Sequence, residues 1–237
     1  MSNSNTLCQN LLRRTRYHKL GAEREELIAR VLPALALDLD EHARVEVAQL
    51  FPVAVSDIIL EIGFGGGEHL VAEARRLPTS GFIGCETYAS GLARLLNEIE
   101  ISELSNIRLY AGDGLDVVRW LPDGCLSRVD VLFPDPWPKL KHQKRRLLRA
   151  PHIPLFARVL RLQSELRFAS DNLDYATHVF DSICRSPFFA PMLPALLDCV
   201  EPWENFPGTQ YHTRAKKEGR QSYFLRFCRN YNPIAPL

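Results

Sequence analysis

The sequence lacks the features of a membrane protein, a secreted protein or a zinc protein. No run approaches the roughly 20 apolar residues that a membrane-spanning helix needs, and the first five residues are polar with no apolar segment behind them. The six cysteines are scattered, without a C-x-x-C pair or the close Cys/His pairing of zinc sites. We therefore expect a cytoplasmic protein with reduced thiols, no membrane segment and no metal. The sequence leaves open whether it is a monomer or a homodimer.

The chain also has little net charge, because 29 Lys and Arg balance 28 Asp and Glu to leave +1. This balance neither favours nor excludes a nucleic acid partner, so the distribution of the charges matters more. At 237 residues, 46% of them hydrophobic, the chain can bury one substantial core. We predict one main domain over residues 53–237, preceded by an N-terminal basic arm and helical extension over residues 1–52.

The N-terminal segment is rich in basic residues, namely Arg13, Arg14, Arg16, His18, Lys19 and Arg24. This cluster fits either an arm that binds a polyanion or a solvated tail. Behind it the spacing predicts a helix from Glu23 to Leu32 that ends before Pro33. An acidic segment with apolar spacing continues to Phe51.

From residue 58 onward, apolar runs of strand length alternate with helical patterns, which predicts a parallel sheet covered on both faces. The predicted strands are 58–62, 81–85, 107–111, 129–133 and 165–169. The predicted helices are 69–77, 90–101, 115–121, 154–160 and 174–184. The C-terminal part predicts a strand at 197–200, a loop through 208–219 and a strand at 222–228, in an antiparallel edge hairpin.

Each of the five predicted parallel strands ends in an acid, and these acids are Glu61, Glu86, Asp113, Asp135 and Asp171. In an open α/β sheet, ligands bind outside the carboxyl ends of the strands. The sequence therefore predicts that these five carboxylates belong to a ligand site at that edge.

A glycine-rich turn follows the first strand, but it lacks the third glycine of the dinucleotide pattern G-x-G-x-x-G, because that position is Glu68. The turn instead has the pattern acid-x-Gly-x-Gly-x-Gly, formed by Glu61, Gly63, Gly65 and Gly67. This pattern looks like the first motif of the methyltransferases that use S-adenosylmethionine, whose cationic amino group and sulfonium suit a carboxylate. A glycine turn without a ligand is the alternative.

Two further acids stand where the same cofactor would need them. Glu86 lies about twenty residues past the glycine turn, where nucleotide-binding folds place an acid that accepts ribose hydroxyls. Asp113 follows the third strand between two glycines and could accept the adenine amine. Taken alone, each residue fits a solvated loop acid or a helix cap equally well.

The fourth strand ends in Phe133-Pro134-Asp135-Pro136-Trp137, in which two prolines restrict the backbone around a carboxylate. A rigid turn with a core tryptophan is the alternative explanation. A cationic run follows with no acid between Asp135 and Arg149. It consists of Lys139, Lys141, His142, Lys144, Arg145, Arg146 and Arg149. A run of one sign beside a fixed carboxylate favours a phosphate-rich nucleic acid substrate.

These segments together resemble the bacterial tRNA (guanine-N7-)-methyltransferases over about residues 57–228. The resemblance rests on Leu60-Glu61-Ile62-Gly63-Phe64-Gly65, on Pro134-Asp135-Pro136-Trp137-Pro138-Lys139 and on His142-Gln143-Lys144-Arg145-Arg146. It implies a Rossmann-like class I fold with a mostly parallel seven-stranded sheet and a C-terminal antiparallel hairpin. It also implies methylation of N7 of guanosine at position 46, in the variable loop of tRNA, with S-adenosylmethionine as methyl donor.

The resemblance also implies roles for individual residues. The cofactor-binding set would be Glu61, Gly63, Gly65, Gly67, Glu86, Asp113 and Asp135, and Asp135 would also be catalytic. The substrate-binding set would be Lys139, Lys141, His142, Lys144, Arg145, Arg146, Asp171, Thr209, Tyr211 and His212. No metal is implied.

The C-terminal motif departs from the family pattern Thr-x-Tyr/Phe-Glu, because Thr209-Gln210-Tyr211-His212 has His in place of Glu. A carboxylate accepts two hydrogen bonds from the edge of guanine, whereas a neutral histidine accepts one. Two other interpretations stay open at this point. One is an amino-group methyltransferase with an Asp-Pro-Pro-aromatic segment, and the other is a catalytically silent RNA-binding protein with the same fold.

Overall fold

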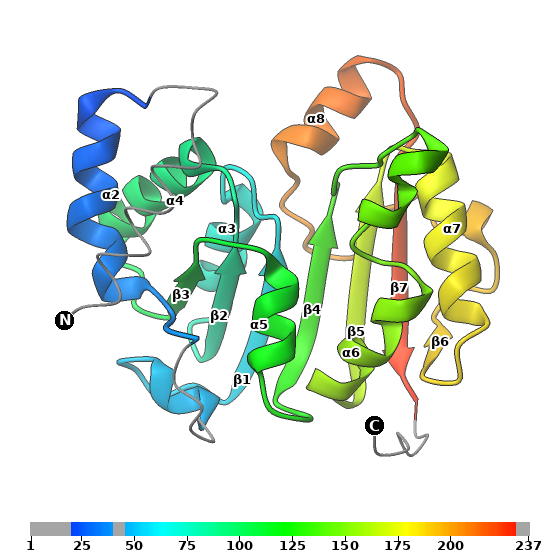
Figure 1. Cartoon of the computed structure of the whole chain (residues 1–237), viewed down its shortest axis with the longest axis horizontal. Coiled ribbons are helices and arrows are strands. Elements are labelled where there is room, and N and C mark those ends of the chain that lie inside the picture. Colours follow the sequence, from blue (N-terminus) through cyan, green and yellow to red (C-terminus); the bar gives the residue numbers. More distant parts are fainter. Residues whose placement is uncertain (1–19, 40–45, 231–237) are drawn as a thin grey trace. The chain divides into compact units, whose positions relative to one another are not determined.

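The structure is a computed structural model that describes residues 20–39 and 46–230 of the chain. The basic cluster from Arg13 to Lys19 lies outside the described residues. The chain divides into two compact units, residues 1–120 and residues 121–237. Each unit is described by itself below (Figure 1).

The first unit contains three parallel strands in the order β3-β2-β1. Its strands are β1 (Asp57–Ile62), β2 (Ser80–Cys85) and β3 (Ile107–Tyr110). Its helices are α2 (Ala22–Leu35), the 3-10 helix η1 (Val47–Leu50), α3 (Glu68–Arg76), α4 (Ala89–Ile101) and α5 (Gly114–Trp120). The predicted alternation of strands and helices is confirmed here, with ends that differ by one or two residues.

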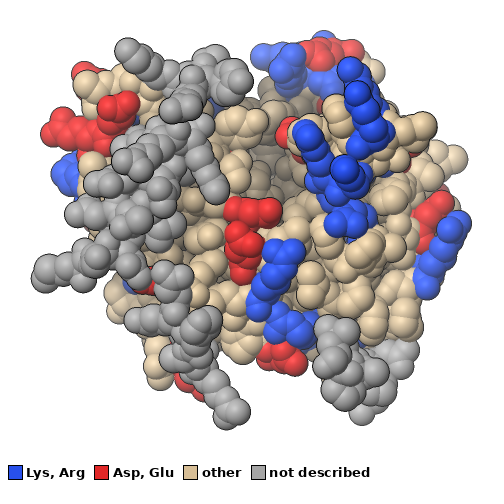
Figure 2. Space-filling view, in the orientation of Figure 1, with Lys and Arg blue, Asp and Glu red and all other residues tan. Residues whose placement is uncertain are grey.

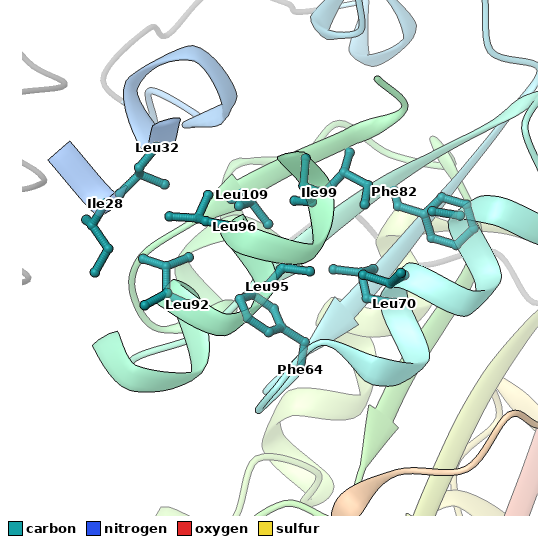
Figure 3. Packing of buried hydrophobic residues seen from close by; sticks show 14 of the residues in the cluster. Ile28, Leu32, Phe64, Leu70, Phe82, Leu92, Leu95, Leu96, Ile99 and Leu109 are labelled. Carbon is teal, nitrogen blue, oxygen red and sulfur yellow. The ribbon is translucent and has the colours of Figure 1, made fainter. Parts of the chain in front are cut away.

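Side chains of α2, α3 and α4 form the core of the first unit together with the strands. Figure 3 shows Ile28 and Leu32 of α2 packed with Leu92 and Leu96 of α4, while Leu70 and Phe82 extend the cluster toward β2. Burial of a Leu or Ile side chain contributes about 1.5–3 kcal/mol. Helix α2 is therefore part of the core that supports the glycine-rich turn.

The predicted end of the first helix at Pro33 is wrong, because α2 continues to Leu35 with Pro33 inside it. A proline in the last turn removes only its own N–H bond, and the N–H of Ala36 still donates to the carbonyl of Leu32 at 2.9 Å. The chain then crosses to the edge of β3, where the N–H of Leu37 donates to the carbonyl of Leu109 at 2.8 Å.

The second unit contains four strands in the order β4-β5-β7-β6. They are β4 (Leu126–Leu132), β5 (Leu160–Ser170), β6 (Phe189–Pro191) and β7 (Tyr223–Arg229). Its helices are α6 (Ile153–Val159), α7 (Leu173–Cys184) and α8 (Gln210–Lys217), with 3-10 turns η2 (Leu140–Arg145), η3 (Ala150–His152) and η4 (Leu196–Asp198). β4 and β5 are parallel, whereas β7 pairs antiparallel with both β5 and β6.

The C-terminal region differs from the sequence prediction in two places. The predicted strand at 197–200 is a 3-10 turn, and the edge strand is β6, which the sequence did not indicate. The predicted loop through 208–219 contains α8, whose two buried residues leave almost no apolar stripe to detect. The prediction of an antiparallel strand near the C-terminus is confirmed by β7.

Among the residues that the structure describes, no helix is long and apolar enough to cross a membrane. The five cysteines within this part of the chain are free thiols. Burial raises the pKa of Cys85 far above its ordinary value and that of Cys125 to about 11, so both stay protonated and inert at neutral pH.

Candidate active site

The glycine-rich turn between β1 and α3 uses left-handed backbone at three positions. The φ angles of Gly63, Gly65 and Gly67 are +77°, +58° and +84°. Residues with a Cβ rarely adopt such angles, so glycine is required at each position. Two backbone bonds hold the turn: the N–H of Gly63 donates to the carbonyl of Cys85 in β2 at 2.8 Å, and the N–H of Gly67 donates to the carbonyl of Phe64 within the turn at 2.9 Å.

Glu86 lies at the centre of this turn and organises it. One carboxylate oxygen accepts the N–H of Gly65 at 2.9 Å. The other accepts the N–H of Thr87 at 2.7 Å and that of Tyr88 at 3.0 Å. The hydroxyl of Thr87 also donates to this second oxygen, at 3.4 Å. The first oxygen accepts only the N–H of Gly65 among these donors, and since each carboxylate oxygen has about two acceptor positions, it has capacity for a ligand hydroxyl. Glu86 therefore joins the glycine turn to the start of α4.

The close packing of α4 against the glycine turn depends on Gly91. A Cβ added at Gly91 would overlap the carbonyl oxygen of Gly65 and lie 3.0 Å from its carbonyl carbon. This contact is with backbone, which cannot rotate away as a side chain can. Nothing in the sequence marks Gly91, because a glycine near a helix start has no motif of its own.

The motif acid Glu61 is buried, with only 2% of its surface exposed. Its carboxylate accepts a hydrogen bond from Nδ1 of His69, in the first turn of α3, at 2.7 Å. His69 is equally buried and was not predicted as a site residue. A carboxylate buried as deeply as that of Glu61 requires a hydrogen-bond partner, and His69 supplies one.

Asp113 stands at the end of β3, and its side chain is exposed. One carboxylate oxygen accepts the N–H of Leu115 at 3.0 Å, so Asp113 caps the first turn of α5. The structure therefore supports the helix-cap interpretation and leaves the side chain accessible as well. Glu61 is the last residue but one of β1, whereas Glu86 and Asp113 follow the ends of β2 and β3, so all three acids stand at the carboxyl ends of the strands of the first unit, as predicted.

In the second unit, the segment that follows β4 has unusual backbone geometry. Phe133 and Trp137, on either side of Pro134-Asp135-Pro136, have φ angles of +51° and +43°. Left-handed backbone at a non-glycine residue costs about 1–3 kcal/mol and concentrates at functional sites. The N–H of Phe133 donates to the carbonyl of Ala169 at 2.7 Å, which fixes the start of the turn to β5. The turn leaves Asp135 exposed.

The cationic run after this turn is divided between surface and interior. Lys139, Lys141, Lys144 and Arg145 are exposed, and Figure 2 shows Lys and Arg gathered over this segment and over α8. The guanidinium of Arg145 lies over the ring of Trp137, 4.9 Å from its centre, and His142 meets the same ring edge-on at 5.9 Å. Arg146, in contrast, is buried.

Asp171, at the end of β5, forms an ion pair with Arg220. Arg220 also pairs with Glu218 at 2.7 Å, so the loop after α8 is tied to the end of β5. Arg220 was not predicted as a site residue, since an isolated arginine after a glycine carries no motif. The pair is partly exposed, and exposed pairs contribute at most about 1 kcal/mol.

Thr209 and His212 shape the start of α8. The hydroxyl of Thr209 accepts the N–H of His212 at 3.1 Å, which makes Thr209 the helix cap. The imidazole of His212 is 7% exposed and packs among Phe133, Phe206 and Phe224 at ring-centre distances of 5.2 to 5.9 Å. Burial, together with the nearby Lys216, lowers the pKa of His212.

The imidazole of His212 therefore supports the turn by stacking on Phe133. This contact differs from the one implied for the family's glutamate, which accepts hydrogen bonds from the edge of guanine. Tyr211 is 45% exposed and remains accessible on α8. Of the predicted residues in the second unit, the structure brings His212 to the start of the turn that carries Asp135. It presents Lys139, Lys141, Lys144 and Arg145 to solvent, and it buries Arg146.

The match to known proteins defines the class. Residues 56–225 match the family model described as "Putative methyltransferase", and the chain belongs to this family. Solved structures of the same class show the fold. A 16S rRNA methyltransferase, KamB, superposes with a TM-score of 0.53 and 14% identity over 75% of this chain and 89% of that one. A SAM-dependent O-methyltransferase from Thermotoga maritima gives 0.51 and 11% identity over 97% and 73%. The predicted class I, mostly parallel seven-stranded fold is confirmed.

Curated relatives give the particular branch of the family. The chain is 44% identical over 217 residues to the tRNA (guanine-N(7)-)-methyltransferase of Bradyrhizobium diazoefficiens, covering 92% of each chain. It is also 44% identical over 216 residues to the protein of the same name from Nitrobacter hamburgensis, covering 91% of this chain and 85% of that one. The family resemblance predicted from the motifs is confirmed.

Proposed function

We propose that the chain is a tRNA (guanine-N7-)-methyltransferase that transfers the methyl group of S-adenosylmethionine to N7 of guanosine 46 in the variable loop of tRNA. The proposal rests on one observation above the others. Asp135 is held exposed in a turn with left-handed backbone at both ends, directly before an exposed cationic segment, in a chain with relatives of that name. We assign the methyltransferase domain to residues 53–237, and the basic arm and helical extension to residues 1–52.

The residues of the first unit suit S-adenosylmethionine, which supplies an electrophilic methyl group on a sulfonium. The three left-handed glycines allow the backbone of the turn to approach a ligand closely beside Glu61 and Glu86. Glu86, held by three N–H groups, is oriented to accept ribose hydroxyls with its remaining capacity. Asp113 accepts the adenine amine, and the buried Glu61, fixed by His69, provides negative charge beneath the turn. No proton transfer is required of any of them.

Asp135 orients the guanine and offsets the positive charge that develops on its ring. N7 of guanine has an in-plane lone pair and no proton, so a general base is not needed. Catalysis then depends on positioning and on electrostatic stabilisation. The two prolines and the left-handed residues around Asp135 fix its carboxylate before the substrate arrives, so little reorganisation remains for the reaction itself.

The exposed cations bind the phosphates of the tRNA. RNA is recognised largely through its shape and its unpaired loops, and phosphate contacts fix the register. We assign this role to Lys139, Lys141, Lys144 and Arg145, with His142 supporting the face of Trp137. Asp171 shares the holding of the guanine edge, and the exposed Tyr211 adds a substrate contact on the same unit. Thr209 caps α8, and His212 supports the turn through Phe133.

The test is to incubate the protein with S-adenosylmethionine and an unmodified tRNA transcript, digest the RNA to nucleosides and identify the product by mass and retention. The Asp135→Asn variant is compared with Asp123→Asn, which removes the same charge from the turn before β4 instead of the turn after it. We expect 7-methylguanosine from the wild type and from Asp123→Asn, and a rate at least about 100-fold lower from Asp135→Asn.

Affinity for the cofactor should stay within a few-fold in both variants. Methyladenosine as the product would assign the chain to the amino-group methyltransferases instead. Absence of any methylated nucleoside, with normal cofactor binding, would favour the catalytically silent RNA-binding protein.

A further inference from the structure

Arg146 belongs by sequence to a cationic surface run, yet the structure places it in the interior. Only 1% of the residue is exposed, whereas its neighbours Lys144 and Arg145 are exposed. Arginine is almost never fully buried unless its charge is paired and its donors are used. A phosphate of bound RNA has no access to a guanidinium in this position, so Arg146 needs a different explanation.

The guanidinium of Arg146 contacts three residues of the second unit, one in the turn after β4 and two at the start of α7. Its Nε donates to the carbonyl oxygen of Pro136 at 2.9 Å. One terminal nitrogen forms an ion pair with Asp174, in the first turn of α7. The plane lies over the ring of Tyr175, with its central carbon 4.8 Å from the ring centre. The accepting carbonyl belongs to the residue that directly follows Asp135.

The partners of Arg146 are themselves fixed. Tyr175 is fully buried, its hydroxyl accepts the N–H of Leu148 at 3.1 Å and its ring packs edge-on against Phe168 of β5. The start of α7 is capped by Asn172, which accepts the N–H of Tyr175 at 2.9 Å. Arg146 therefore ties the turn that carries Asp135 to a rigid helix start.

We propose that Arg146 is a positioning residue that holds the Pro134-Asp135-Pro136 turn in its catalytic geometry, rather than a phosphate contact. This inference rests on the proposed function, since it assigns how the carboxylate of that reaction is kept in place. Arg146 acts through the carbonyl of Pro136 and does not itself touch the substrate.

The chemistry of this position requires arginine. A planar guanidinium can donate to Pro136, pair with Asp174 and stack on Tyr175 at the same time, because its donors are arranged in a rigid fork. A lysine ammonium can make one or two of these contacts but cannot stack. Loss of all three contacts releases a turn with two left-handed residues, and displacement of a positioned group by about 1 Å can cost about 100-fold in rate.

Arg145 provides a matched control. It carries the same charge, is adjacent in sequence and also lies over an aromatic ring, that of Trp137. It differs in being exposed, which makes it a candidate phosphate contact. Replacement of Arg146 should therefore affect the rate of methyl transfer, whereas replacement of Arg145 should affect the affinity for RNA.

The experiment compares Arg146→Met, Arg146→Lys, Asp174→Asn and Arg145→Met by single-turnover methylation at saturating tRNA and S-adenosylmethionine, and by tRNA binding over a series of salt concentrations. For Arg146→Met we expect a rate about 100-fold lower, with tRNA affinity within about twofold at every salt concentration. Arg146→Lys should recover part of this loss. Arg145→Met, in contrast, should bind tRNA more weakly, with a salt slope smaller by about 1.

Hydrogen exchange of the free protein gives a readout that does not depend on activity. The N–H groups of Phe133, Arg146 and Leu148 each donate to a partner in the structure, so they should be protected in the wild type. Faster exchange in peptides spanning 133–148 is expected for both Arg146 variants but not for Arg145→Met. If Arg146→Met does not fold, Arg146→Lys and Asp174→Asn carry the test, since the Asp174 side chain is 66% exposed.

Two results would overturn the inference. One is that Arg146→Met behaves as the loss of a phosphate contact, with weaker, less salt-dependent tRNA binding and a normal methylation rate at saturation. The other is that Arg146→Met has a lower melting temperature but a normal methylation rate and normal hydrogen exchange over residues 133–148. If the wild type methylates no tRNA, the proposed function fails, but the exchange data still decide whether Arg146 holds the turn.

Discussion

Replacement of Gly91 by alanine tests whether the tight contact between α4 and the glycine turn matters for cofactor binding. The new methyl group would overlap the carbonyl oxygen of Gly65, so either α4 or the turn must move. Because the N–H of the same Gly65 donates to Glu86, a displaced turn also breaks that bond. The substitution thus perturbs the proposed cofactor site without touching any of its charged groups.

The expected change in stability combines two opposing effects. Overpacking of a well-packed contact costs about 1–3 kcal/mol, and the upper end applies here since the obstacle is backbone. Glycine to alanine within a helix contributes about 1 kcal/mol in the opposite direction through helix propensity. The free energy of unfolding should fall by about 2 kcal/mol, which lowers the melting temperature by about 4–8 °C in a chain of this size.

Affinity for S-adenosylmethionine should fall about tenfold or more, because a bond to a charged group such as Glu86 contributes about 1.5–3 kcal/mol. The control is Gly66→Ala in the same turn, whose Cβ would meet only the end of the exposed Glu68 side chain. That chain can rotate away, so Gly66→Ala should stay within about twofold in affinity, a difference below about 0.5 kcal/mol. Thermal unfolding and calorimetric titration measure both quantities. Wild-type stability and cofactor affinity in Gly91→Ala would refute the reasoning.

Two further predictions concern Glu86 and His212. In Glu86→Gln, one carbonyl oxygen replaces two carboxylate oxygens that accept three N–H groups, so cofactor affinity should fall about 10- to 100-fold; equal affinity in a calorimetric titration would contradict this role. The pKa of His212 is lowered by burial, so the folded protein binds fewer protons there than the unfolded chain. Its contribution to stability is present above the ordinary histidine pKa of about 6.5 and is lost as the pH falls through the lowered value. Urea unfolding between pH 7.5 and about 5 should show a smaller loss in His212→Phe than in the wild type. Some loss should remain, because burial also lowers the pKa of His178; identical pH profiles would exclude a buried neutral His212.

Most of the fold was predictable because its signals are local. A buried parallel strand such as β1 is a continuous apolar run, and a glycine turn after it has few alternatives. The missed helix α8 had a Thr209 cap and basic residues in its last turn, but only His212 and Ala215 are buried. Without an apolar stripe, the cap at Thr209 is too weak a sign of a helix, and the glycines on either side favour a loop.

The site was predictable by residue type but not by contact. Sequence position placed Asp135 and Glu86 after strands, and the structure has both there. The sequence could not distinguish the exposed Arg145 from the buried Arg146. The burial of Arg146 depends on Asp174 and Tyr175, which are distant in sequence. His69 and Arg220 went unnoticed for the same reason, since each acquires its role from a partner that only folding supplies.

The position of β7 has a consequence for how the protein is made. This strand is the last of the seven along the chain, yet it lies between β5 and β6 rather than at an edge. Until residues 223–229 leave the ribosome, β5 and β6 each expose an unpaired edge, a state prone to association with other chains. Phe224, one of the rings around His212, arrives with the same strand. A nascent chain therefore completes the support of the Asp135 turn only after residues 223–229 have been made. A product truncated before β7 should aggregate.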